Sequence, residues 1–175
     1  MLIDLRAIPR AGARQFRLCL AEDWWHADEF DNQVLGLDGP LSVNIEIYRA
    51  GDKFALRGEL AGSLIINCDR CLTPYRQDIK TKFNIFIVRT PQEDEKAEIE
   101  LLEQDLEVAF TNSDEIELDE IIKEQLYLSI PIKSICKEGC LGLCPVCGSN
   151  MNNGDCKCKK EKVHPGFAKL KGLKI

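Results

Sequence analysis

The chain has 175 residues, of which 30% are charged, with a formal net charge of −6 and nine cysteines. This length suffices for one domain with its own hydrophobic core, so the cysteines are not needed to hold a very small fold together. Asp4 and Arg6 interrupt the apolar start of the chain, which argues against a secretory signal, and no apolar run approaches the roughly 18 residues of a membrane-spanning helix. We therefore expect a cytoplasmic protein with reduced thiols that does not act at a membrane.

The charges are distributed unevenly along the chain. Residues 91–120 contain thirteen acids and one lysine, whereas residues 157–175 contain seven lysines and one glutamate. Residues 41–90 carry eight lysines and arginines against five acids. An acidic protein can therefore still present a basic face, so the net charge does not exclude nucleic-acid binding.

Two short segments precede the clearest pattern. LIDL near the start predicts a strand, and DEFDNQVLG (28–36) predicts a short helix. Strands are predicted across the middle of the chain, because apolar and polar residues alternate in SVNIEIYR (42–49), KFALRGEL (53–60) and RQDIKTKFNIFIVR (76–89). LIINC (64–68) predicts a further strand after a turn at AGS (61–63), and Gly58 predicts a β-bulge. Four consecutive strands with short turns predict an antiparallel meander.

The second half of the chain supplies a helix. After an acidic connector at 90–107 and a short strand at VAFT, the stretch DEIIKEQLYLSIPI places Ile122 and Leu126 on one apolar stripe. Asp119 is the expected N-cap, and the helix should end before Pro131. This helix can cover the apolar face of the sheet. The tail HPGFAKLKGLKI predicts a short basic amphipathic helix.

These elements predict an α+β fold with two parts. The core, residues 1–135, combines an antiparallel sheet that could close into a barrel with one main helix packed against it. Residues 136–175 would form a cysteine-rich knuckle and the basic tail helix.

Six of the nine cysteines lie between residues 136 and 158. A CxxC pair at Cys144 and Cys147 is followed, after a run of turn-forming residues, by Cys156 and Cys158. Gly148 can supply the positive φ that such a knuckle often needs. In a reduced compartment, four thiolates around one tetrahedral Zn²⁺ satisfy this spacing best.

A second set of four cysteines is available. Cys68 and Cys71 form another CxxC pair, and Cys136 and Cys140 form another close pair, so these four would make a second candidate zinc site if the two segments meet in space. For the C-terminal segment, the alternatives are an iron–sulfur cluster, redox-active or unligated cysteines, and a Cys₃His site that uses His164. Cys19 is left over and is expected to be a buried or semi-buried thiol on a strand.

Features of an active site are scarce. The two histidines, His26 and His164, have no nucleophile beside them in sequence, and no phosphate-cradling motif is present. Trp24 and Trp25 are expected to serve packing. We therefore expect a protein without catalytic residues, with one enzyme alternative: a thiol oxidoreductase that uses Cys68 and Cys71.

Several stretches together resemble the YceD family of large ribosomal RNA subunit accumulation proteins, found in bacteria and plastids. CDRCL resembles the family's C-x-R-C-L signature. DEIELDEIIKEQLYLSIPIKSIC is similar to a stretch of the family in which an acidic segment leads into an apolar helix and a proline then precedes a cysteine. CKEGCLGLCPVCGSNMNNGDCKC is similar to the cysteine segment of many members. HPGFAKLKGL resembles the family's tail, although His164 replaces Asp and Gly166 replaces Arg.

The resemblance implies a role in the synthesis, processing or stability of the large-subunit (23S) ribosomal RNA. It implies neither a catalytic mechanism nor a set of metal ligands. Some members keep the first CxxC but lack most of the C-terminal cysteines, which favours a self-contained C-terminal knuckle.

We therefore expect a non-enzymatic factor in large-subunit biogenesis. Its partner would be large-subunit ribosomal RNA or a pre-ribosomal particle, with a ribosomal protein as a further candidate and no small-molecule substrate. Binding would be mainly electrostatic. The candidate RNA-binding residues are Lys157, Lys159, Lys160, Lys162, Lys169, Lys171 and Lys174 near the C-terminus, and Arg57, Arg70, Arg76, Lys80 and Lys82 on the sheet. In the rival interpretation, the acidic segment Glu93–Glu120 docks a basic ribosomal protein and RNA is not contacted.

Overall fold

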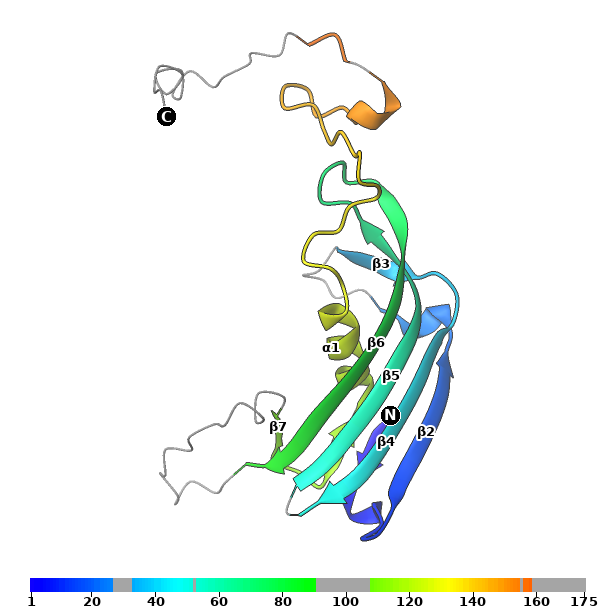
Figure 1. The fold of residues 1–175 in the computed structure, drawn as a ribbon, viewed down its shortest axis with the longest axis vertical. Helices are drawn as coiled ribbons and strands as arrows, with labels where there is room; N and C mark the ends of the chain where they lie inside the picture. The colour runs from blue at the N-terminus through cyan, green and yellow to red at the C-terminus, as the bar shows by residue number, and fades with distance from the viewer. Residues whose placement is uncertain (27–32, 52, 91–107, 155, 159–175) are drawn as a thin grey trace, which may run out of the picture.

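The computed structural model describes residues 1–26, 33–51, 53–90, 108–154 and 156–158. Its centre is a long curved sheet of six strands, with one α-helix against the concave side and the cysteine-rich segment at one end (Figure 1). The strands and the helix of the described residues are β1 (Leu2–Asp4), β2 (Ala13–Leu20), β3 (Val34–Leu37), β4 (Leu41–Ala50), β5 (Lys53–Asn67), β6 (Pro74–Arg89), β7 (Val108–Thr111), β8 (Glu115–Glu117) and α1 (Leu118–Leu128). Within the same described ranges, short 3₁₀ turns lie at Leu5–Ala7, Glu22–Trp24 and Met151–Asn153.

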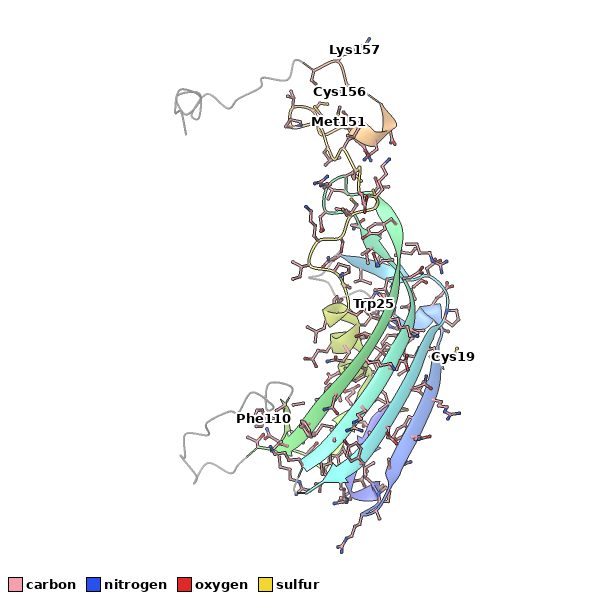
Figure 2. The ribbon with its side chains drawn as sticks, viewed as in Figure 1. Cys19, Trp25, Phe110, Met151, Cys156 and Lys157 are labelled. Carbon is pink, nitrogen blue, oxygen red and sulfur yellow. The ribbon has the colours of Figure 1, made fainter. Side chains whose placement is uncertain are left out.

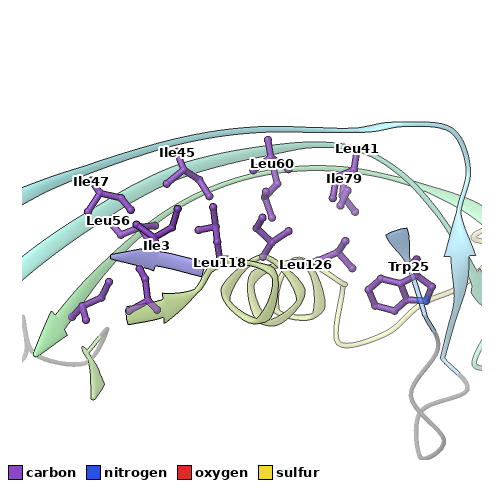
Figure 3. Packing of buried hydrophobic residues seen from close by; sticks show 14 of the residues in the cluster. Ile3, Trp25, Leu41, Ile45, Ile47, Leu56, Leu60, Ile79, Leu118 and Leu126 are labelled. Atoms are coloured by element: carbon purple, nitrogen blue, oxygen red, sulfur yellow. The ribbon is translucent and has the colours of Figure 1, made fainter. Parts of the chain in front are cut away.

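The sheet is open, so the predicted α+β class holds but barrel closure is wrong. Its strand order is β2-β4-β5-β6-β7, with β3 also paired to β5. The predicted antiparallel pairing is wrong for β6 and β7, which pair parallel, whereas the other neighbouring strands of this sheet pair antiparallel. The two strands that end this order, β2 and β7, do not pair with each other among the described residues. The concave apolar face is instead covered by α1 and by the separate two-stranded sheet of β1 and β8, which removes the need for closure (Figure 3).

The predicted four-strand meander is a three-strand one, because β5 is continuous through AGS. Ala61, Gly62 and Ser63 all keep their pairing with β6. At this point the other neighbour of β5 changes from β4 to β3. A Cβ at Gly62 would lie 2.9 Å from the end of the Leu41 side chain, so the small residue gives space to the start of β4 and does not mark a turn.

Gly58 does not form the predicted bulge. It stays in register between Ile45 on β4 and Phe83 on β6. A Cβ at this position would lie 2.1 Å from the Phe83 ring. The glycine therefore makes room for an aromatic ring on the sheet.

The helix covers the core as predicted, with a different cap. Leu118, Ile122 and Leu126 on α1 are fully buried and face the concave side of the sheet (Figure 3). The N-cap is Glu117 rather than the expected Asp119, which lies in the first turn of the helix. The Asp119 carboxylate instead accepts a hydrogen bond from Trp24 Nε1 at 2.7 Å.

The N-terminal expectations have mixed outcomes. LIDL contributes β1, as predicted, and Trp25 is buried against the Tyr127 ring, with centroids 5.4 Å apart. The helix expected over residues 28–36 is wrong where it can be checked, because Val34–Leu37 pairs with β5. Cys19 lies on β2 as expected, but it is exposed rather than buried (Figure 2).

Two expected segments, the acidic connector up to residue 107 and the tail helix with His164, lie outside the described residues. No helix in the described part of the chain is long and apolar enough to cross a membrane.

Candidate metal centres

Cys68 and Cys71 lie in the turn between β5 and β6, where the chain that follows α1 brings Cys136 and Cys140 against them (Figure 1). The four Sγ atoms lie within 4.8 Å of one another. The Sγ atoms of Cys68 and Cys140 are 3.9 Å apart, and those of Cys71 and Cys136 are 3.8 Å apart. Two sulfurs bound to one tetrahedral Zn²⁺ at about 2.3 Å are about 3.8 Å apart. We call this group the hairpin cluster.

Polar contacts hold the two segments of the hairpin cluster together. The backbone N–H of Asp69 donates to the Ser134 carbonyl at 2.8 Å, and the Ser134 N–H donates to the Asp69 carboxylate at 2.6 Å. Arg70 donates from Nη1 to the Cys140 carbonyl at 3.0 Å. Arg70, expected to contact RNA, therefore has a local contact that fixes the position of Cys140.

Cys144, Cys147, Cys156 and Cys158 form a second group, which we call the terminal cluster. Their Sγ atoms also lie within 4.8 Å of one another, and those of Cys144 and Cys156 are 3.2 Å apart. The N–H of Val146 points at the Cys144 sulfur at 3.5 Å. Figure 2 shows Cys156 beside Met151 at the far end of the molecule from Phe110.

The same backbone turn follows both CxxC pairs. Leu72 and Gly148 each come directly after the second cysteine, and both have a left-handed backbone, with φ of 57° and 71°. The N–H of Leu72 donates to the Cys68 carbonyl at 2.8 Å, and the N–H of Gly148 donates to the Cys144 carbonyl at 2.9 Å. The positive φ predicted for Gly148 is confirmed. The turn at Cys68 and Cys71 has the same backbone, with Leu72 in place of the glycine.

The loop between Cys147 and Cys156 of the terminal cluster contacts the hairpin cluster. Asn152 donates to the Cys140 sulfur at 3.4 Å and accepts from the Leu141 N–H at 3.0 Å. Asn150 donates to the Thr73 hydroxyl at 2.9 Å. Neither asparagine was predicted, since the only signal in the sequence was a run of turn-forming residues. The two clusters therefore form one continuous cysteine-rich unit on the end of the β5–β6 hairpin.

The surroundings of the sulfurs separate their pKa values. Burial raises the pKa of Cys68, but nearby backbone N–H groups, first that of Cys136, outweigh burial and lower it to about 6. The Ser149 hydroxyl and N–H lower the pKa of Cys147 to about 6. Burial and the neighbouring thiols raise the pKa of Cys136 to about 12. The side-chain hydrogen bond with Cys147 raises the pKa of Cys158 to about 12. Each cluster thus contains both a readily ionised thiol and a protonated one, whose proton a bound metal would displace.

The hairpin cluster and the terminal cluster could each hold one metal ion. Four cysteine sulfurs complete a tetrahedral shell and leave no position for a water or substrate, which is the arrangement of structural rather than catalytic sites. The sulfurs of the hairpin cluster are mostly buried, whereas Cys147 of the terminal cluster is exposed.

The candidate RNA-binding residues fall into separate regions. Arg57, Lys80 and Lys82 lie on the convex outer face of the sheet, where both lysines approach Glu59 at 3.8 and 4.0 Å. Arg76 pairs with Asp38 and Asp78. Lys157 is exposed within the terminal cluster, beyond the end of the sheet (Figure 2). The other candidates, Lys159, Lys160, Lys162, Lys169, Lys171 and Lys174, lie outside the described residues.

Comparison with known proteins identifies the family. Residues 56–174 match the family described as "Large ribosomal RNA subunit accumulation protein YceD", a range that includes both clusters. The chain belongs to the YceD family. The resemblance drawn from the sequence is therefore confirmed.

Two plant relatives are named large ribosomal RNA subunit accumulation protein YCED homolog 1, chloroplastic. The Zea mays protein is 27% identical over 157 residues, which cover 77% of this chain and 53% of the relative. The Arabidopsis thaliana protein is 24% identical over 156 residues, which cover 77% of this chain and 49% of the relative. This YceD chain thus spans about half the length of both plant proteins.

A bacterial relative is matched over more of its length. An uncharacterized protein of Mycobacterium bovis is 25% identical over 173 residues, covering 97% of this chain and 79% of the relative. No solved structure matches.

Proposed function

We propose that this YceD protein is a non-enzymatic cytoplasmic factor that supports accumulation of the large-subunit (23S) ribosomal RNA by binding that RNA or a pre-ribosomal particle. The observation that carries the proposal is family membership over residues 56–174, because the family is named for this role. The non-enzymatic part is supported by the four-sulfur clusters, in which each CxxC pair has two further cysteine neighbours.

The proposal assigns one Zn²⁺ to each cluster. Sulfur-only donor sets and sulfur separations of 3.8 and 3.9 Å in the hairpin cluster favour zinc. The bound ions would hold the loops between the cysteines in one conformation. The lysine-rich segment that begins at Lys157 would then be attached to a rigid part of the protein.

Two basic regions are proposed to contact phosphates. One is the lysine-rich segment 157–174, with seven lysines and one glutamate. The other is the outer face of the sheet at Arg57, Lys80 and Lys82, whose side chains are exposed. Contacts of this kind release counterions, so affinity falls steeply as the salt concentration rises.

Filter binding to fragments of large-subunit ribosomal RNA tests the proposal. Wild-type affinity should fall by about tenfold or more between about 50 and 200 mM salt. Replacing the seven C-terminal lysines with glutamine should weaken binding and flatten its salt dependence. The triple variant Arg57→Gln, Lys80→Gln and Lys82→Gln tests separately whether the outer face of the sheet contacts the RNA.

Arg10→Gln with Lys123→Gln is a control for charge removal elsewhere, since these cations lie outside both regions and their replacement should leave RNA binding unchanged. Absence of binding, or binding that ignores salt and all of these substitutions, would overturn the RNA-binding proposal.

A further inference from the structure

A groove runs between α1 and β7, at the opposite end of the sheet from the cysteine clusters. It has a volume of about 580 Å³, and its floor includes Ile87, Ala109 and Ile116. A smaller hollow of about 200 Å³ adjoins it, with Ala109 and Glu124 lining both, and we treat the two together as one groove. We call it the acidic groove.

One wall of the acidic groove is a stripe of α1 and the residue that caps it. Glu117, Glu120, Ile121, Glu124 and Leu128 follow one another at helical spacing, and all of them line the groove. At 1.5 Å per residue this wall is roughly 16 Å long, which matches about three turns of a docked helix.

The charged residues that line the groove are all acidic: Glu115, Glu117, Glu120 and Glu124. None of these four side chains forms a salt bridge or hydrogen bond with another described residue. Phosphates would be repelled here, so RNA does not suit this groove. A ligand with positive charge does.

The groove also exposes large apolar side chains. Leu2, Phe110 and Leu128 are 65%, 56% and 71% exposed. Phe110 on β7 can be found at the lower left of Figure 2. Apolar side chains that alternate with unneutralised carboxylates along one groove suit a partner with both apolar and basic side chains.

The chain's own segments do not suit the groove. Residues 93–107 carry eight acids and one lysine, so they cannot neutralise it. The tail residues Phe167, Leu170 and Leu173 have the right chemistry, but they follow Cys158 by nine, twelve and fifteen residues, so even fully extended they reach about 30, 40 and 50 Å from it, too short for all three to dock. β6 alone separates the two ends of the sheet by 16 residues, roughly 50 Å.

We propose that the acidic groove docks a short, lysine- or arginine-rich amphipathic segment of a protein partner. Apolar side chains of that segment pack on Phe110 and Leu128, while its cations pair with Glu117, Glu120 and Glu124. This site is separate from the RNA-binding regions proposed above and does not depend on them. One molecule can therefore hold RNA and a basic protein at once.

The test uses the full chain and designed helical peptides labelled for fluorescence anisotropy. One peptide has leucines at i, i+3, i+4 and i+7 with lysines between them. A second replaces the lysines with glutamates, and a third replaces the leucines with serines. Only the first should bind, with an affinity that falls as salt rises, because the groove requires both features.

Groove variants locate the binding site. Glu117→Gln with Glu120→Gln and Glu124→Gln should weaken the first peptide by about tenfold or more, and Phe110→Ser should weaken it as well. Glu22→Gln with Glu46→Gln and Glu138→Gln is the charge-matched control on other surfaces and should bind as wild type. Circular dichroism and thermal melting of every variant show whether it is folded.

Three outcomes overturn the proposal: no peptide binds, the peptide without leucines binds equally well, or folded groove variants bind like the control. Light scattering adds a fourth. A dimer that dissociates when the tail lysines are replaced and when the groove glutamates are replaced would make a second copy the occupant. An RNA fragment that fails to displace the peptide supports separate sites, whereas competition at the groove contradicts them.

Discussion

Leu72 and Gly148 occupy equivalent positions after the two CxxC pairs, with the same left-handed backbone and the same hydrogen bond to the first cysteine. Glycine adopts this conformation without cost, whereas leucine is strained by about 1 kcal/mol or more. Leu72 is also 63% exposed, so burial of its side chain does not offset the strain. The four-sulfur cluster and the Asp69–Ser134 contacts hold the turn in this conformation.

Gly58 is the residue at which a missing side chain matters most to the sheet. Gly58→Ala should lower the free energy of unfolding by about 1–3 kcal/mol, because a Cβ there displaces the Phe83 ring. Urea denaturation measures the change. Phe83→Leu in the same background should recover part of it.

Gly36→Ala is the control for this substitution. Gly36 also lies on a strand, but a methyl group added there would have no neighbouring atom within 4 Å, so stability should change by no more than about 0.5 kcal/mol. Equal losses at Gly36 and Gly58 would contradict the role of Gly58 in making room for the ring.

At the scale of elements, α1 serves two surfaces. Its buried stripe, Leu118, Ile122 and Leu126, packs on the concave face of the sheet. Its other stripe, which includes Glu124 and Leu128, forms a wall of the acidic groove. The helix can therefore hold the fold with one face and present the groove with the other.

Two leucines on α1 separate these roles. Leu126→Ala should lower the free energy of unfolding by about 2–4 kcal/mol, because Leu126 is fully buried and its removal leaves a cavity. Leu128→Ala removes the same atoms from an exposed position and should change stability by less than about 0.5 kcal/mol. Chemical denaturation checks both, and similar losses would mean that α1 is not docked as described.

At the scale of the whole molecule, the hairpin cluster joins segments that are far apart in sequence. It brings Cys68 and Cys71 to Cys136 and Cys140, although β6 and α1 lie between the two pairs in the sequence. The terminal cluster closes only the short loop from Cys144 to Cys158. A metal that closes the longer loop restricts the unfolded chain more.

Removing cysteines in pairs should distinguish the clusters. Cys136→Ser with Cys140→Ser, and Cys147→Ser with Cys158→Ser, should each lower the bound zinc from two ions per chain to one. Only the first pair should lower Tm of the core by about 5 °C or more, because only that cluster ties the hairpin to the chain after α1.

Cys19→Ser is the control for the cysteine pairs. Cys19 is exposed on β2 and belongs to neither cluster, so neither zinc content nor Tm should change. Elemental analysis and thermal melting check these results. A chain that binds no metal when expressed with zinc would contradict the metal assignment.

Local patterns predicted much of the fold because they depend on near neighbours. Alternation located most of the strand residues of β4, β5 and β6, and the helical stripe located α1. The same local reasoning misplaced a turn at AGS, since small residues mark both turns and places where two strands approach closely. It also chose Asp119 as a cap, although that carboxylate binds Trp24 from a distant part of the chain.

The sequence by itself determined the α+β class, the family and the set of four cysteines in the terminal cluster, because periodicity, motif and spacing are properties of the chain. Only the tertiary structure decided that the sheet stays open, that Cys68 and Cys71 meet Cys136 and Cys140, and that α1 and β7 enclose an acidic groove. Each of these depends on how distant segments pack, which sequence separation does not specify.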